Sequence, residues 1–181
     1  MLYRRMNQTD VKLSILGFGC MRLPQTTNCS IDEPRAKKMV RYAIDHGINY
    51  FDTAYVYHNG ESEPFLGRAL SDGYREKVQI ATKLPVWDVQ SQNDMDRILN
   101  EQLLRLNTDH IDFYLLHGLG KTSWINMLNL NVGEFLDQGE TDADPLELAL
   151  RRIIRLEEPA EYLRQFLARN AHACVAHLKH D

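Results

Sequence analysis

The sequence predicts one α/β unit in which parallel strands alternate with helices. Short apolar runs alternate with amphipathic stretches from residue 1 to about residue 130, and this order of strand, helix and strand is the pattern of parallel βαβ units. The chain has 181 residues, of which 44% are hydrophobic. That is enough for one sizeable core and too little for two full domains.

The first predicted elements are a hairpin and a short strand. The stretches 2–6 and 11–15 flank the polar segment 7–10, which is typical of a small hairpin. The run LGFGCM at 16–21 predicts a short buried strand, and its glycines permit the close approach of other backbone.

The next elements follow in regular alternation. Ser30 and Glu33 have the spacing of a capping box, which predicts the start of a helix, and Gly47 is a natural point for that helix to end. Further along, apolar residues recur on single helical faces or in short runs. The pattern predicts strands at 48–51, 78–82 and 111–116, and helices at 63–70, 93–106 and 124–136.

The alternation stops after residue 138. A polar segment is followed by helical patterns at 146–157 and 159–179, with Pro159 at a first helical position. We therefore divide the chain into a (β/α) part, residues 1–138, and a helical tail, residues 139–181.

Composition argues against several classes of protein. The net charge of -4 argues against a nucleic acid or an anionic membrane surface as partner. No run of 18 apolar residues is present to span a membrane, and no apolar signal segment follows the basic start, so we expect a cytoplasmic protein. The three cysteines are far apart and form no C-x-x-C pair, which favours reduced thiols over disulfides or a metal site.

Three predicted strands run into an ionisable residue. Asp52, Lys83 and His117 follow their apolar runs at intervals of 31 and 34 residues, close to the length of one βα unit. Because the carboxyl ends of parallel strands lie at one edge of the sheet, we expect these side chains to converge. Tyr57, on the loop after Asp52, would lie over the same place.

Together these four side chains suit the reduction of a carbonyl group. A phenol is a poor acid at neutral pH, and a buried ammonium beside it stabilises the phenolate form. The Asp52 carboxylate would keep Lys83 charged and oriented, and His117 would donate a hydrogen bond to the carbonyl oxygen. The hydride has to come from a cofactor, because no side chain supplies one.

Each of these residues taken alone also has a purely structural interpretation. A strand-end aspartate is often a helix cap, a strand-end lysine is often solvated, and a tyrosine is often half-buried packing; only the four together favour a site. Trp87 suits either the wall of a substrate pocket or a packed loop anchor, and Cys20 suits a small core residue at a strand end better than a reactive thiol. The run GFG at 17–19 lacks the third glycine and the following helix of a dinucleotide-binding fingerprint.

The same residues lie in motifs that resemble the aldo-keto reductase family. The matching pieces are LGFGCMRLP (16–24), HGINYFDTAYVYHNGESE (46–63), VQIATKLP (78–85) and TDHIDFYLLH (108–117). The resemblance covers residues 1 to about 138. It is similar to the bacterial branch whose longer members add a ferredoxin-like iron–sulfur segment, for which the sequence shows no cysteine cluster.

The resemblance implies roles for individual residues. Tyr57 would be the general acid, Lys83 and Asp52 would tune it, and His117 would orient the carbonyl group of a small substrate. The implied cofactor is NADP(H), and its nicotinamide end would lie near Gly19, Cys20, Met21 and Asp52.

The resemblance also implies the fold, a (β/α)8 barrel with an N-terminal hairpin. A complete barrel takes about 250 residues, so the expected fold is a partial (β/α)8 barrel with an N-terminal β-hairpin, followed by a helical tail. Its exposed strand edges would be covered by the tail or by a second copy, which predicts a homo-oligomer through the open barrel edge or the helical tail.

Three functions stay open at this point. The first is NADP(H)-dependent reduction of aldehydes or ketones to alcohols. The second is a catalytically incompetent, truncated fragment or an interaction protein. A weaker third makes Lys83 the Schiff-base nucleophile of an aldolase-like barrel.

Overall fold

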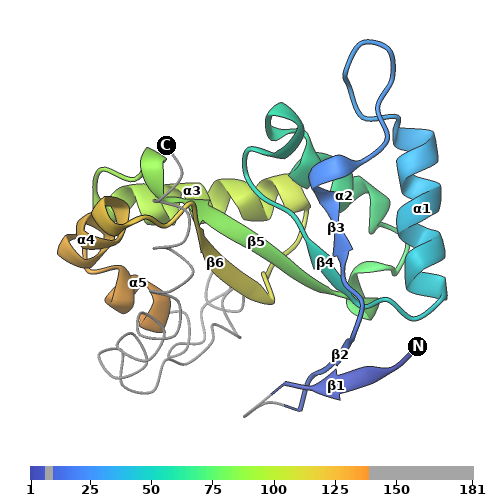
Figure 1. The fold of residues 1–181 in the computed structure, drawn as a ribbon, viewed down its shortest axis with the longest axis horizontal. Helices are drawn as coiled ribbons and strands as arrows, with labels where there is room; N and C mark the ends of the chain where they lie inside the picture. The colour runs from blue at the N-terminus through green and yellow to red at the C-terminus, as the bar shows by residue number, and fades with distance from the viewer. Residues whose placement is uncertain (7–9, 139–181) are drawn as a thin grey trace, which may run out of the picture.

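The computed structural model describes residues 1–6 and 10–138, which form a hairpin and a layered α/β unit (Figure 1). The hairpin consists of β1 (Tyr3–Arg5) and β2 (Lys12–Ser14). The parallel sheet has the order β3 (Phe18–Gly19), β4 (Tyr50–Asp52), β5 (Gln79–Pro85) and β6 (Phe113–His117). The helices are α1 (Glu33–Asp45), α2 (Ser62–Ala69), α3 (Gln92–Leu106), α4 (Lys121–Asn129) and α5 (Val132–Gln138). The predicted hairpin and the alternation of parallel strands with helices are thus confirmed.

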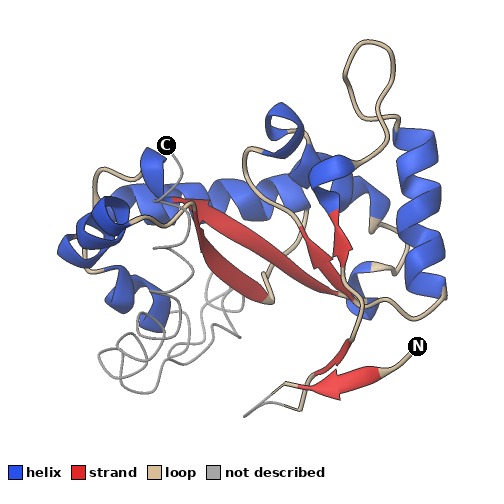
Figure 2. Ribbon diagram, viewed as in Figure 1, coloured by secondary structure: helices blue, strands red, loops and turns tan. Residues whose placement is uncertain are grey.

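The core lies between one face of the sheet and the helices. Helices α1, α2 and α3 lie along this face, and α4 and α5 follow on the side of β6 (Figure 2). Because successive side chains of a strand point to opposite faces, Phe51, Ile80 and Leu84 share the helix-facing side, and all three are fully buried. The opposite face carries the polar residues at the strand ends.

Helices α2 and α3 touch through a glycine. A Cβ atom on Gly67 would lie 2.5 Å from the backbone oxygen of Leu106 at the end of α3. Backbone atoms cannot move aside as a flexible side chain can, so only glycine fits at this crossing.

The hairpin is fastened to the amino end of β4. The Tyr3 hydroxyl donates to the Gly47 carbonyl oxygen over 2.9 Å. The Asn49 side chain accepts from the backbone N–H of Ser14 over 2.7 Å and donates to the carbonyl oxygen of Lys12 over 2.8 Å. These bonds place the hairpin below the sheet, at the end opposite the ionisable residues (Figure 1).

The predicted start of the first helix is wrong by two residues. Asp32, not Ser30, is the N-cap, because its carboxylate accepts from the backbone N–H of Arg35 over 3.3 Å. The Ser30 hydroxyl instead pairs with Thr26 Oγ1 at 2.8 Å within the preceding loop.

Two further predictions need correction. The predicted helix at 124–136 is two helices, α4 and α5, because Asn131 between them takes a left-handed φ of 53°, a conformation that asparagine tolerates better than most residues. The predicted buried strand at 16–21 is only two residues long and continues into a 3-10 turn at Cys20–Arg22, while Leu16 is 56% exposed.

The predicted helices at 146–157 and 159–179 lie outside the described residues. The tail and the boundary after residue 138 therefore stay predictions. In the part of the chain that is described, no helix combines the length and the apolar character needed to cross a membrane.

Candidate active site

Lys83 is the centre of the polar cluster at the carboxyl end of the sheet. Its Nζ atom donates to Asp52 Oδ1 over 2.8 Å, to the Thr53 carbonyl oxygen over 2.7 Å and to Tyr57 Oη over 3.3 Å. An ammonium group has three N–H donors, and here each has an acceptor. The Lys83 side chain is only 13% exposed, so these contacts replace most of its hydration.

The strand register explains why these side chains meet. Asp52 is level with Ala81 on β5, and Lys83 is level with Leu115 on β6, two residues further toward the carboxyl end. His117, level with Pro85, continues the same step on the same face. The prediction that Lys83 ends its strand is wrong, because β5 continues to Pro85. Its side chain still points to the site, since the alternation of the strand directs it there.

Tyr57 reaches the cluster from the loop after β4. It begins a short helical turn, Tyr57–Gly60, in which His58 and Asn59 both have left-handed backbone. The Lys83 Nζ atom lies 4.8 Å from the centre of the Tyr57 ring as well as within hydrogen-bond distance of the hydroxyl. The phenol is thus held against the ammonium by two contacts.

His117 and Trp87 form the other wall of the cluster. The His117 ring meets Tyr57 edge to face, with centroids 5.9 Å apart, and lies 5.0 Å from the Trp87 ring. Burial, followed by repulsion from the Lys83 ammonium, lowers the pKa of His117, which favours the neutral imidazole. Trp87 is half exposed and is packed on one side by Gly118, where an added Cβ would lie 2.8 Å from the indole.

Of the four residues predicted beside a nicotinamide, Asp52 belongs to this cluster, and the other three lie at the end of the neighbouring strand β3 and in the turn after it. Gly19 is level with Asp52, and a Cβ on it would meet no atom within 4 Å. Met21 is 53% exposed, whereas Cys20 is fully buried. Burial raises the pKa of the Cys20 thiol to about 12, with a smaller contribution from the Asp52 carboxylate. Cys20 is therefore an unreactive core residue, and only its backbone can face a ligand.

A buried polar network, which the sequence did not reveal, lies on the helix-facing side of the sheet behind the cluster. Glu63 Oε1 accepts from the Thr82 hydroxyl over 2.6 Å and from Gln102 Nε2 over 2.7 Å. Gln102 Nε2 also lies 3.2 Å from the carbonyl oxygen of Lys83, and its Oε1 accepts from the Tyr114 hydroxyl over 2.6 Å. A signal for this network exists in hindsight, since Glu63 and Gln102 interrupt apolar helix faces.

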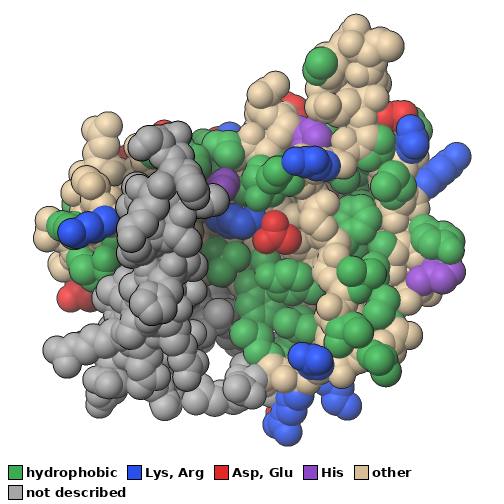
Figure 3. Space-filling view, viewed as in Figure 1, with side chains coloured by type: hydrophobic (Ala, Val, Ile, Leu, Met, Phe, Trp, Pro, Cys, Tyr) green, Lys and Arg blue, Asp and Glu red, His purple; other side chains and the backbone are tan. Residues whose placement is uncertain are grey.

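The space-filling view shows how this end of the sheet is presented to solvent. Acidic, basic and histidine side chains lie close together near the middle of the visible face, above a stretch of hydrophobic surface (Figure 3). This combination of ionisable groups beside apolar surface is typical of small-molecule sites. Among the described residues, no group of three or more His, Cys, Asp or Glu side chains is placed to hold a metal ion.

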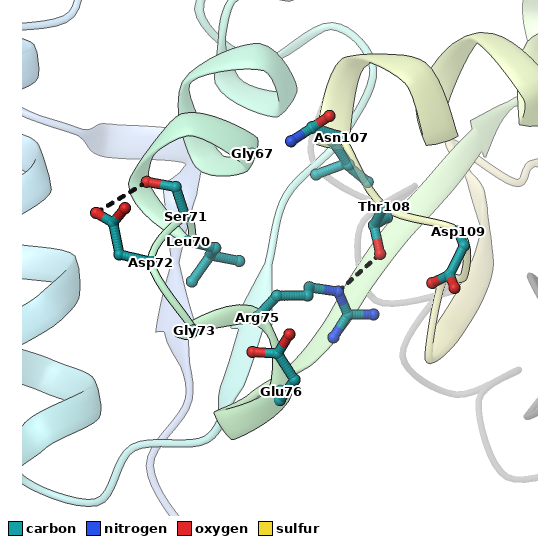
Figure 4. A pocket seen from close by; sticks show the side chains of 11 residues that line it. Gly67, Leu70, Ser71, Asp72, Gly73, Arg75, Glu76, Asn107, Thr108 and Asp109 are labelled. Carbon is teal, nitrogen blue, oxygen red and sulfur yellow. Dashed lines mark hydrogen bonds between the residues drawn. The ribbon is translucent and has the colours of Figure 1, made fainter.

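A separate cavity of about 330 Å³ lies between the C-terminal ends of α2 and α3 (Figure 4). Its main cation, Arg75, is already engaged, because the guanidinium donates to Thr108 Oγ1 over 2.9 Å and to Asp112 Oδ2 over 2.8 Å. The cavity lies at the amino end of β5 and β6, so it is remote from the Lys83 cluster.

Comparisons with known proteins point to one family. The family model "Aldo/keto reductase family" matches residues 15–140. A probable aldo-keto reductase 1 from Glycine max is 37% identical over 114 residues, which are 59% of this chain and 33% of that protein. The chain thus spans about a third of the length of this curated relative.

Solved structures show the same likeness. The holo form of aldo-keto reductase AKR11C1 from Bacillus halodurans is 29% identical with a TM-score of 0.67, over 93% of this chain and 54% of that one. An aldo-keto reductase from Klebsiella pneumoniae, crystallised in complex with NADPH, is 27% identical with a TM-score of 0.54, over 68% and 43% of the two chains.

Proposed function

The chain belongs to the aldo/keto reductase family, and from this premise we propose that it is an NADP(H)-dependent oxidoreductase that reduces aldehydes or ketones to alcohols. The observation that carries the proposal is the contact of Tyr57 Oη with the Lys83 ammonium, which also pairs with Asp52. A phenol held in this way is a proton donor whose conjugate base has a cation beside it.

Each residue of the cluster has a role in this reaction. Tyr57 gives its proton to the carbonyl oxygen of the substrate as that oxygen becomes an alcohol. Lys83 donates to Tyr57 Oη throughout, so it stabilises the phenolate that remains. Asp52 balances the charge of Lys83, and together with the Thr53 carbonyl it fixes where the ammonium points.

His117 and Trp87 receive the substrate. The lowered pKa of His117 favours the neutral imidazole, which can donate a hydrogen bond from its protonated nitrogen to the carbonyl oxygen and leaves the role of acid to Tyr57. Trp87 supplies an apolar wall beside it, which suits the body of a small carbonyl compound.

The described residues fit the nicotinamide end of the cofactor. Gly19 offers open backbone next to the Asp52 carboxylate, and the half-exposed Met21 side chain offers an apolar contact. The bound dinucleotide supplies the hydride, which no side chain can provide. The NADPH complex of the Klebsiella pneumoniae relative supports this choice of cofactor.

The remaining expectations follow from the same proposal. We assign the reductase part to residues 1–138 and expect a partial barrel, a small carbonyl compound as substrate and no nucleic-acid or membrane partner. A reducing cytoplasm suits the two unpaired thiols of the described residues, Cys20 and Cys29. Self-association through the β6 edge would complete the sheet.

The Schiff-base alternative is disfavoured, because all three N–H donors of Lys83 are engaged and a nucleophilic amine must be uncharged.

The first test is a titration of the purified 181-residue chain with NADPH, followed by fluorescence, together with turnover of 4-nitrobenzaldehyde. We expect saturable binding and consumption of NADPH. Tyr57→Phe should lower turnover by roughly 10²-fold or more, as for loss of a general acid, while the dissociation constant for NADPH stays unchanged.

Two outcomes would contradict the proposal. Unchanged turnover in Tyr57→Phe would remove the named acid. A folded chain without saturable NADPH binding would instead support the alternative of an incompetent fragment or interaction protein.

A further inference from the structure

His58 connects the loop of Tyr57 to the turn that follows β3. Its Nε2 atom lies 3.1 Å from the backbone nitrogen of Leu23, which donates to it, and 3.2 Å from the carbonyl oxygen of Cys20. Its Nδ1 atom lies 3.3 Å from Gln25 Nε2. One imidazole therefore contacts both ends of the 3-10 turn at Cys20–Arg22.

Both neutral tautomers of His58 preserve this connection. With the proton on Nδ1, Nε2 accepts from the Leu23 N–H. With the proton on Nε2, that nitrogen donates to the Cys20 carbonyl oxygen. In either case the residue directly after Tyr57 is bonded to the backbone that flanks Met21.

The backbone of the Tyr57 loop is held in a strained conformation. His58 has φ 53° and ψ 43°, and Asn59 has φ 57° and ψ 35°. Left-handed backbone costs a residue with a side chain roughly 1–2 kcal/mol, and it persists only where the surrounding structure fixes it. The Glu61 N–H donates to the His58 carbonyl oxygen over 3.2 Å, and the imidazole contacts join this backbone to the Cys20–Arg22 turn.

We propose that His58 is a positioning residue, which clasps the Cys20–Arg22 turn and so holds Tyr57 at a set distance from the backbone that receives the nicotinamide. The inference rests on the proposed reductase function. His58 acts through the backbone of its neighbours and not on the substrate, because its ring nitrogens are directed at Cys20, Leu23 and Gln25.

Four variants of the full chain separate this role from a general effect on folding. In His58→Gln the amide reaches the position of Nε2 and can both accept from Leu23 and donate to Cys20. In His58→Asn the amide reaches only the position of Nδ1. His58→Gly removes the ring and also the strain, so loss of stability is minimised. Asn59→Gly is the matched control, which relieves the same strain at the neighbouring residue and leaves the His58 ring in place.

Two readouts are needed. We expect His58→Gly and His58→Asn to lose roughly tenfold or more in kcat/KM for NADPH with 4-nitrobenzaldehyde, while His58→Gln and Asn59→Gly retain most of it. Hydrogen–deuterium exchange of peptides covering residues 20–25 should accelerate in His58→Gly and His58→Asn only.

The outcomes distinguish failure of this inference from failure of the proposed function. Unchanged exchange at residues 20–25 in His58→Gly overturns the clasp, and so does an equal loss of activity in His58→Gln and His58→Gly. If the wild-type chain neither binds NADPH nor turns over, the proposed function fails and the positioning role fails with it. The exchange readout then still shows whether the clasp exists.

Discussion

Glu63 is the most deeply buried acidic side chain among the described residues, with none of its surface exposed. Burial raises the pKa of its carboxyl group above the ordinary value of 4.5, and the hydrogen bonds from Thr82 and Gln102 oppose this only in part. Its Oε2 atom has no hydrogen-bond partner, although the Arg105 guanidinium lies 3.7 Å away. The carboxyl group of Glu63 therefore keeps its proton to a higher pH than a free glutamate does.

This preference predicts a pH dependence of stability. Above about pH 4.5 the folded chain retains a proton on Glu63 that the unfolded chain has lost, so the contribution of Glu63 to the free energy of unfolding falls as the pH rises toward the raised pKa. Glu63→Gln should remove that slope. Urea unfolding between about pH 4.5 and 7.5 would measure it, with the exposed Glu61→Gln as control. If the free energies of unfolding of wild type and Glu63→Gln change with pH in parallel, the pKa of Glu63 is the same in the folded and the unfolded chain, and the prediction is wrong.

At the same scale, the sequence predicted which polar residues meet but not how they are held. Asp52, Lys83 and His117 could be found because each follows an apolar run. The acceptor role of the Thr53 carbonyl and the clasp by His58 depend on backbone conformation, which residue types alone do not encode. The close contact of Trp87 with Gly118 depends on the absence of a side chain at residue 118, which leaves no pattern to detect.

The elements pack through close backbone approach as well as through apolar faces. Helix α2 lies against the last turn of α3 at Gly67, where a single added carbon would clash with the backbone of Leu106. By contrast, a Cβ on Gly133 in α5 would meet nothing within 4 Å. The two glycines are therefore a matched pair for measuring this contact.

Gly67→Ala is expected to lower the free energy of unfolding by about 1–3 kcal/mol, because the two helices must move apart to admit the methyl group. Gly133→Ala should be neutral or stabilising by up to about 1 kcal/mol, since alanine is the better helix former. Chemical denaturation of both variants would check this. Equal changes in the free energy of unfolding would mean that α2 and α3 move apart without loss of stability.

Elements with a strong period were predicted best. Helix α3 was predicted at 93–106 and lies at Gln92–Leu106, because its apolar residues recur regularly on one face. The cap of α1 was misplaced because Ser30 and Asp32 are both good cap residues two positions apart. The break between α4 and α5 was missed because apolar residues continue across it, while a single left-handed asparagine turns the chain.

At the scale of the whole molecule, the site is separate from a second buried ion pair, that of Arg75 with Asp112. The Lys83 cluster lies at the carboxyl end of the sheet, whereas Arg75 and Asp112 pair at the amino end, with 14% and 8% of their side chains exposed. Arg75 also donates to the carbonyl oxygens of Val78 and His110, so it joins the starts of β5 and β6. Stability and chemistry are therefore expected to respond to different substitutions.

Arg75→Met is expected to destabilise the fold by about 3 kcal/mol, because it leaves Asp112 buried without its cation. When it is measured well below the melting temperature, the dissociation constant for NADPH should equal that of the wild type, since no site residue contacts Arg75. Arg97→Met, which removes a partner of Asp94 from an exposed pair, should cost less than about 1 kcal/mol. A large change in NADPH affinity in Arg75→Met would show that the two ends of the sheet are coupled.

The strand order of the described sheet is also the order of the chain, β3, β4, β5 and β6. Each strand pairs with the one made before it, so the sheet can grow from its N-terminal side during synthesis. We expect the cluster to assemble in the same direction, with the Asp52 and Tyr57 loop first, the Lys83 ammonium next and the His117 wall last. When β5 but not β6 has emerged from the ribosome, we expect the nascent chain to hold Tyr57 and Lys83 together already. It would still lack His117, the group that orients a carbonyl.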